Sequence, residues 1–465
     1  MWDAMLETAL TRIESLKTYY FSVVEKYENN LLRDGENRKF ALETKAYLYL
    51  YSKVKSGLKP AQQEKFEQLK KEIGKYIEVD ESLSADPSVL YYRIINQDEL
   101  QQQGIRLDID DAFKSVLDAF DKYEILNSST LIMLMTRFEE FISSFLEKLF
   151  TKYPDKYLAG VEIPFSEIQD SSNFKELKNR IIREQVEVRM RESFKEWFKI
   201  FQEHKMNIEQ YVNGMDTLSE IYARRNIWVH NSGYVNQTYI KLSKNCKNSC
   251  DEKMQIDKRY LSIAFSVIKK YMFIISIEAC RLLDKDSVNT EIVNLFNLTF
   301  NCFCEKDYET SIAAFKCLEN AKFITLEYKY MSIVNIWISL KEKGEIDCCR
   351  KEIEDFDTSA LHAKFKMAKY LLLDKFEEAD KIVKQLLEKN DIEFYHVKNW
   401  PLFIGYRKTE YYHTLQVEYD NEYSVEDLAS ANKLLNNDAL QFMESSLAKP
   451  ETSAEEQHEE ECIQQ

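Results

Sequence analysis

An arginine, an asparagine and a histidine lie within six consecutive residues near the middle of this 465-residue chain. They are Arg225, Asn226 and His230. The surrounding stretch, residues 221–250, holds three lysines and two arginines but no aspartate or glutamate. The whole chain has a formal net charge of −16, so this local excess of positive charge around a histidine indicates a place where phosphate binds.

The spacing of Arg225 and His230 resembles the Arg-x4-6-His signature of the HEPN superfamily, in which a polar residue such as Asn226 often follows the arginine. Residues 131–141, which include the Phe138-Glu139 step, are similar to the first long helix of such a domain. The resemblance implies a helical domain that, in many members, is a metal-independent ribonuclease. It also implies a homodimer in which two copies of the motif form one active site.

The motif residues have the chemistry that RNA transesterification requires. Near the end of a helix the dipole favours a protonated His230, which can donate a proton to a leaving 5′-oxygen. Arg225 can offset charge that builds up on phosphorus, and Asn226 can orient the histidine or the phosphate. On an ideal helix Arg225 and His230 lie about 140° apart with a rise of about 7.5 Å, which makes pairing of two protomers reasonable.

Further cations near the motif are predicted to bind RNA phosphates, namely Arg224, Lys241, Lys244 and Lys247. Residues 171–260 carry 17 lysines and arginines against 12 aspartates and glutamates, a local charge of +5, so the remainder carries −21. Tyr234 and Tyr239 either stack on bases or are partly buried bundle residues. We predict no metal and no cofactor, because the chain has no obvious carboxylate cluster, zinc-type spacing or glycine-rich phosphate loop.

The composition predicts an almost entirely helical protein of the cytoplasm. Only 9 glycines and 6 prolines occur in the whole chain, which disfavours turn-rich β structure. The 9 cysteines are odd in number and irregularly spaced, as free thiols in a reducing compartment are. The first seven residues include two acids and do not look like a secretory signal, and the apolar run 271–277 is too short to span a membrane.

We expect an all-α fold with four regions: an N-terminal helical region (1–109), a HEPN-like four-helix bundle with the motif (110–285), TPR-like helical hairpins (286–447) and an acidic disordered tail (448–465). The four bundle helices are expected at 131–149, 174–201, 208–229 and 260–283. Glycine commonly follows the last helical residue, so Gly233 should end the third helix and place His230 in its last turn.

A faint internal repeat predicts the hairpins. Residues 307–311 (Asp-Tyr-Glu-Thr-Ser) and 375–379 (Lys-Phe-Glu-Glu-Ala) align at a separation of 68 residues, and residues 344–349 lie between them. This separation is twice the tetratricopeptide period of about 34 residues. The full consensus is missing, so we predict only TPR-like helix pairs.

The leading interpretation is a regulated endoribonuclease that cleaves RNA without metal, a toxin-like effector of anti-phage defence or abortive infection, where the resemblance commonly leads. A regulatory protein would bind the terminal helical regions. One alternative is a non-catalytic scaffold whose terminal helices bind a protein partner. Another is a nucleotide-binding partner of a nucleotidyltransferase.

Overall fold

The computed structural model describes residues 1–422, except 34, 55, 56, 59, 81–90, 106–108, 165–167, 169–172, 193, 213, 244–248, 284 and 322–324. Helix makes up 78% and strand 2%, so the prediction of a mostly helical protein is confirmed. The chain forms two compact units, Met1–Ile336 and Trp337–Gln465. The first unit therefore contains the motif together with helices from both sides of it.

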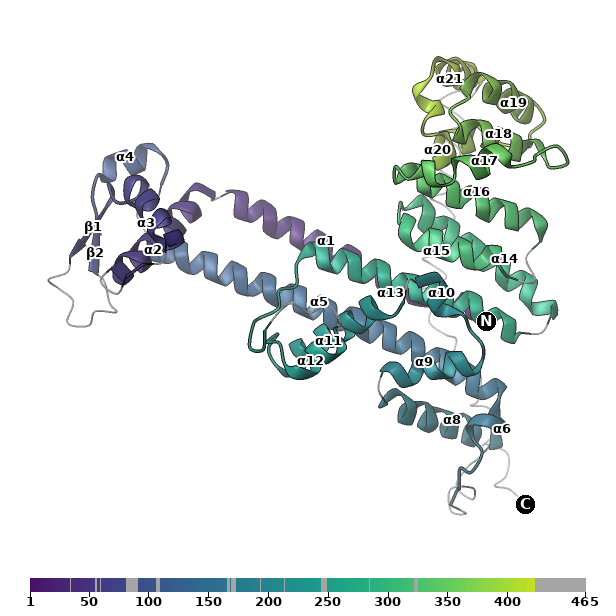
Figure 1. The fold of residues 1–465 in the computed structure, drawn as a ribbon, viewed down its shortest axis with the longest axis horizontal. Helices are drawn as coiled ribbons and strands as arrows, with labels where there is room; N and C mark the ends of the chain where they lie inside the picture. Colours follow the sequence, from purple (N-terminus) through teal and green to yellow (C-terminus); the bar gives the residue numbers. More distant parts are fainter. Residues whose placement is uncertain are drawn as a thin grey trace, which may run out of the picture. The chain divides into compact units, whose positions relative to one another are not determined.

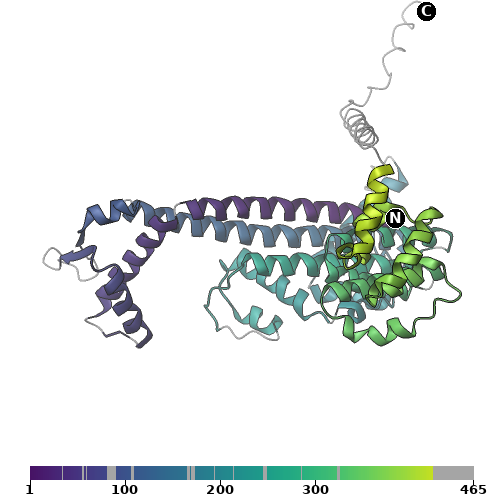
Figure 2. The same cartoon turned by 90° about the horizontal axis from the view of Figure 1, so that it is seen from above.

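Two long helices, α1 (Trp2–Arg33) and α5 (Ile109–Lys152), form the centre of the first unit. They lie side by side and run antiparallel (Figures 1 and 2). α13 (Lys258–Ala279) packs against both. The Tyr20 hydroxyl donates to Asn127 Oδ1 at 2.7 Å, and Asn127 Nδ2 donates to the Ile256 carbonyl at 2.8 Å. These buried bonds fix the register of α1 on the bundle that carries the motif.

The apolar positions that predicted the first bundle helix are all buried in α5. They are Leu131, Leu134, Met135, Phe138, Phe141, Ile142, Phe145 and Leu149. Their spacing places them on one face of the helix, where α1, α13 and their neighbours cover them. α5 ends before Pro154, as predicted, and the short helix α6 (Pro154–Tyr157) follows.

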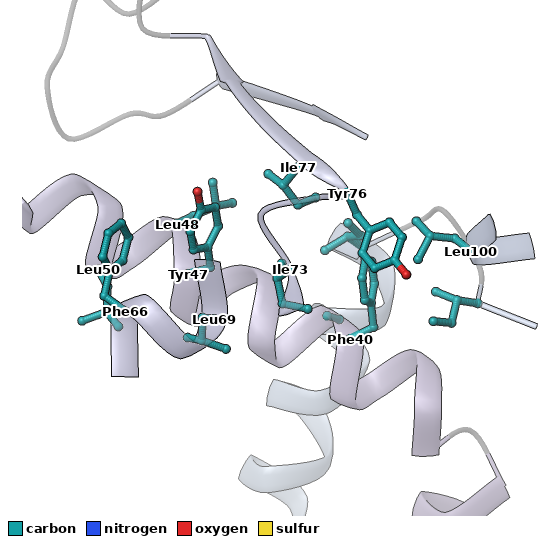
Figure 3. Packing of buried hydrophobic residues seen from close by; sticks show 13 residues of the cluster. Phe40, Tyr47, Leu48, Leu50, Phe66, Leu69, Ile73, Tyr76, Ile77 and Leu100 are labelled. Atoms are coloured by element: carbon teal, nitrogen blue, oxygen red, sulfur yellow. The ribbon is translucent and has the colours of Figure 1, made fainter. Parts of the chain in front are cut away.

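A small lobe with its own hydrophobic core joins α1 to α5 (Figures 1 and 3). It contains α2 (Gly35–Val54), α3 (Pro60–Glu72), β1 (Ile77–Asp80), β2 (Tyr91–Ile94) and α4 (Gln97–Gln102). The strands pair antiparallel, with Ile77 opposite Ile94. They were not predicted, because four residues are too few to show alternation. Residues 81–90, which connect the two strands in the sequence, lie outside the described residues.

Two of the expected bundle helices are broken. Residues 174–201 form α8 (Phe174–Met190) and α9 (Phe194–Glu203), and the Trp197 indole N–H donates to the carbonyl of Arg189 at 2.9 Å between them. Residues 208–229 form α10 (Ile208–Val212) and α11 (Asp216–His230). Gly214 lies between α10 and α11 with φ +87°, a conformation that interrupts a helix.

Helix pairs follow the bundle. After η2 (Cys280–Leu282), α14 (Lys285–Cys304) packs on α15 (Tyr308–Glu319), and α15 also contacts α13. α16 (Leu326–Glu342) crosses the boundary between the two units.

The second unit continues with η3 (Ile346–Cys348), α17 (Arg350–Asp355), α18 (Ala363–Leu372), α19 (Phe376–Glu388), α20 (Phe394–Asn399), η4 (Pro401–Phe403), η5 (Tyr406–Lys408) and α21 (Glu410–Glu422). α18 packs on α19. The two aligned segments, 307–311 and 375–379, therefore both begin the second helix of a pair. The predicted acidic tail, 448–465, lies outside the described residues.

One helical segment, Lys258–Leu282, is long and apolar enough to cross a membrane by length and composition alone. Of its apolar window, 67% is buried inside the protein. The core helix of a globular protein has the same composition, so this segment by itself does not assign a location.

Candidate functional site

The motif helix α11 packs against α5 and α13. Leu218, Ile221 and Ile227 are buried and hold it in place. The helix ends at His230, where the N–H groups of Asn231 and Gly233 both donate to the Ile227 carbonyl, at 2.8 and 3.0 Å. Ser232 (φ +49°) and Gly233 (φ +84°) form a left-handed turn after the helix, and the prediction that His230 lies in its last turn is confirmed.

Arg225 points from α11 toward α5 and forms an ion pair with Glu139. Its Nη2 donates to Oε1 and Oε2 of Glu139 at 2.6 and 2.7 Å. The Arg225 side chain is 16% exposed and that of Glu139 24%, so the pair is largely covered but still reaches solvent. Burial raises the pKa of Glu139, although the adjacent guanidinium acts in the opposite direction.

Asn226 and Tyr222 hold the other side of the arginine. Nη1 of Arg225 donates to Asn226 Oδ1 at 2.9 Å, and Asn226 also hydrogen-bonds Tyr222. The guanidinium carbon lies 5.6 Å from the centre of the Tyr222 ring. Asn226 therefore orients Arg225 in this structure. The Arg225 Nε is buried and has no hydrogen-bond partner among the described residues.

His230 is exposed at the end of α11, away from the Arg225–Glu139 pair. The two motif residues are five positions apart, so on a regular helix they project about 140° apart. By this geometry the largely covered guanidinium and the exposed imidazole project from different faces of α11.

Arg224 is occupied by internal contacts. Its Nε donates to Glu220 Oε1 at 2.7 Å and its Nη1 to the Gln255 carbonyl at 2.8 Å, and its guanidinium lies 4.0 Å from the Tyr260 ring centre. Glu220 also accepts from the hydroxyls of Tyr239 (2.6 Å) and Tyr260 (2.9 Å). Arg224 therefore joins α11 to α13 and to the segment that follows the motif.

The other predicted RNA-binding residues are three lysines. Lys241 is exposed at the end of α12 (Gln237–Leu242), whereas Lys244 and Lys247 lie outside the described residues. Tyr239 is buried, and Tyr234 is exposed and available for stacking. Of the predicted cations, Lys241 is thus the one that the described structure leaves on the surface.

The chain after the motif folds back onto α11. Ala223, Ile227, Val235, Tyr239 and Met254 form a small buried cluster, and the Met254 N–H donates to the Gly233 carbonyl at 2.9 Å. Because this cluster covers the side of α11 that carries Ala223 and Ile227, it leaves the end of the helix at His230 open.

Exposed apolar side chains lie on α5 and α11, the helices that carry Glu139 and Arg225. Met133 on α5 is 43% exposed, six residues before Glu139, and Val229, immediately before His230, is 45% exposed. Single exposed apolar side chains are common on protein surfaces and do not by themselves mark an interface.

Among the described residues, no group of three or more histidines, cysteines, aspartates or glutamates is arranged to hold a metal ion. Cys250, Cys280, Cys302, Cys304, Cys317, Cys348 and Cys349 are free thiols. In comparisons with known proteins, no family model, no curated protein and no solved structure matches the chain significantly.

Glu139 is the site residue that the sequence did not assign. The Phe138-Glu139 step was noted only as part of a helix, and its carboxylate reaches Arg225 across 86 residues of sequence. A glutamate among apolar positions of a predicted core helix was the available signal, because such a carboxylate requires a cationic or hydrogen-bonding partner.

Proposed function

We propose that the protein is a metal-independent endoribonuclease of the HEPN type that acts as a homodimer. The observation that carries this proposal is the arrangement of α11: an exposed histidine ends the helix, and one turn earlier an arginine is fixed by Glu139 and Asn226. The acid-free stretch 221–250 surrounds them. These are the groups needed to bind a phosphate and to protonate a leaving oxygen.

In the proposed reaction the 2′-oxygen of a ribose gives its proton to solvent water and bonds to the neighbouring phosphorus, and the bond from phosphorus to the 5′-oxygen breaks. His230 supplies the proton that the leaving 5′-oxygen takes. Arg225 offsets the charge on the phosphorane, and Asn226 keeps the guanidinium in place. The products are a 2′,3′-cyclic phosphate and a 5′-hydroxyl, and DNA is not a substrate.

A second protomer completes the site in this proposal. Arg225 and His230 of one chain project from different faces of α11, so two copies of the helix are needed to surround one phosphate. The exposed Val229 and Met133 supply apolar surface for this association. The dimer would be a C2 assembly, in which the same surface of each protomer faces the other.

The biological role we propose is that of a regulated toxin or effector of anti-phage defence in the cytoplasm. An RNase that is always active would damage its own cell, so its activity must depend on assembly, an inhibitor or a signal. The lobe between α1 and α5 and the C-terminal helix pairs are the regions we propose for binding a regulatory protein.

The direct test is incubation of the purified protein with total RNA in the presence and absence of EDTA, beside His230→Ala and Arg225→Ala. Each variant is expected to lose activity by about a hundredfold or more, as loss of a general acid or of charge stabilisation does. EDTA should have no effect. Cleavage that is equal in the wild type and both variants would show a contaminating nuclease and end the proposal.

The second candidate function is a non-catalytic scaffold. The Arg225–Glu139 pair favours it, because a paired, largely covered arginine is also what a purely structural contact looks like. A scaffold would show no RNA cleavage and would bind a protein partner through its terminal helices. The third candidate is a nucleotide-binding partner of a nucleotidyltransferase. It predicts that ATP binds with a measurable heat in calorimetry, and the absence of that heat would count against it.

A further inference from the structure

Most nitrogens of the Arg225 guanidinium are already engaged by protein groups or buried, which limits the hydrogen bonds that it can donate to a substrate. Nη2 donates to both carboxylate oxygens of Glu139, and Nη1 donates to Asn226. The Nε proton is buried. The carboxylate at 2.6 Å largely neutralises the positive charge. A phosphate approaching this arginine therefore meets a negative charge, and Glu139 already contacts Nη2, one of the nitrogens that a forked pair of hydrogen bonds to phosphate would use.

We propose that Glu139 is an internal competitor of RNA phosphate, and that substrate binds Arg225 only when the carboxylate leaves the guanidinium. This inference deepens the proposed function and takes its biological meaning from it. Glu139 would then lower the affinity of the resting protein for RNA and keep the site inactive until RNA and assembly together displace it.

The surroundings of the pair allow this exchange. The Glu139 side chain retains access to solvent, so a displaced carboxylate can regain hydration. Its pKa is raised mainly by burial, which shows that the ionised form gives up solvation in the paired state. Asn226 and the Tyr222 ring also contact the arginine, so these two contacts remain when the carboxylate leaves.

The opposite role, in which Glu139 positions Arg225 for catalysis, predicts the opposite sign. If the carboxylate only holds the guanidinium in place, its removal weakens RNA binding or leaves it unchanged. If it competes with phosphate, its removal strengthens binding, because the freed guanidinium gains a charge-assisted hydrogen bond to the substrate.

The test measures binding of a short fluorescent RNA in which every ribose carries a 2′-O-methyl group, so that transesterification cannot occur. The variants are Glu139→Gln, Arg225→Ala and the two combined. Glu140→Gln is the matched control, because Glu140 is the neighbouring carboxylate and makes exposed ion pairs with Arg12 and Arg137. Glu139→Ala serves as the second variant if the glutamine variant does not fold.

Glu139→Gln is expected to bind the RNA about tenfold more tightly than the wild type, the effect of one gained hydrogen bond to a charged group. The slope of log affinity against log salt should steepen by about 0.7, because one more cation releases a counterion from a single strand. Both changes should disappear when Arg225→Ala is added. Glu140→Gln should behave as the wild type.

Binding by Glu139→Gln that equals or is weaker than wild-type binding would overturn the inference, and so would a gain that persists without Arg225. The result is separable from the proposed function, because the probe cannot be cut. Tighter binding without cleavage of ordinary RNA by any variant supports the competition and rejects the nuclease. Cleavage together with unchanged or weaker binding does the reverse.

Discussion

Arg225 is held by a carboxylate that lies 86 residues away in the sequence. The proposed chemistry of the motif could be predicted from residue types, because the arginine and the histidine lie five positions apart in one basic stretch of the chain. The pairing with Glu139 could not, since it depends on how α11 packs on α5. The same limit applies to Arg224, predicted to bind RNA from its charge, whose guanidinium contacts Glu220 and Tyr260.

Thiol reactivity tests the burial of single residues. Burial raises the pKa of Cys280 to about 12, whereas Cys348 is exposed. Because the thiolate is the reactive form, iodoacetamide at pH 8 should label Cys348 quickly and Cys280 only after unfolding. Cys317 is buried, its pKa is also raised, and it should behave like Cys280. Mass spectrometry of peptides after a time course measures this, and labelling of Cys280 as fast as Cys348 would show that the bundle is not closed as described.

Helix ends were predictable where a local rule sets them and unpredictable where a distant side chain does. Gly233 was expected to follow the end of the motif helix, and it lies in the left-handed turn there, in which Ser232 also has a positive φ (+49°). The break between α8 and α9 was not expected, because the sequence 174–201 keeps its helical spacing. There the Trp197 indole N–H donates a hydrogen bond to the Arg189 carbonyl, a contact that the spacing of apolar residues does not predict.

The end of α11 should be sensitive to substitution of Gly233. In Gly233→Ala the new Cβ would lie 2.7 Å from the Trp228 ring, in a backbone conformation unfavourable to alanine. The strained conformation costs about 1–2 kcal/mol, and the overlap adds about 1–3 kcal/mol. We expect the free energy of unfolding in urea to fall by the sum, and RNA cleavage to fall with it because His230 is displaced.

Gly160→Ala is the matched control for that experiment. Gly160 has φ +79° and no atom within 4 Å of an added Cβ, so the substitution introduces backbone strain without overlap. It should lower the free energy of unfolding by about 1–2 kcal/mol and leave RNA cleavage unchanged. Equal losses of stability in the two variants would show that Trp228 does not pack on Gly233 as described.

At the scale of the whole molecule, composition was sufficient to predict a helical protein, and periodicity located α5 and α13. The role of α1 was not predicted, because the sequence indicated only an N-terminal helical region there. In the structure it packs along α5 and α13, and the buried bond from Tyr20 to Asn127 joins segments 107 residues apart. The strands β1 and β2 were missed because each has only four residues.

The proposed activity belongs to the assembled molecule, since one chain presents Arg225 and His230 on different faces of α11. Arg225→Ala and His230→Ala should each be inactive alone. When the two variants are mixed in equal amounts and allowed to exchange protomers, half of the dimers contain one of each. Each such dimer keeps one Arg225 and one His230 at its shared site, so up to about half of wild-type RNA cleavage should return.

The measurement that tests the account most directly is therefore the rate of RNA cleavage, in EDTA, by the equimolar mixture of Arg225→Ala and His230→Ala. Recovery to as much as about half of the wild-type rate is expected, with 2′,3′-cyclic phosphate and 5′-hydroxyl ends on the products. A mixture that exchanges protomers yet stays as inactive as either variant, beside an active wild type, would contradict a site shared between two copies of α11.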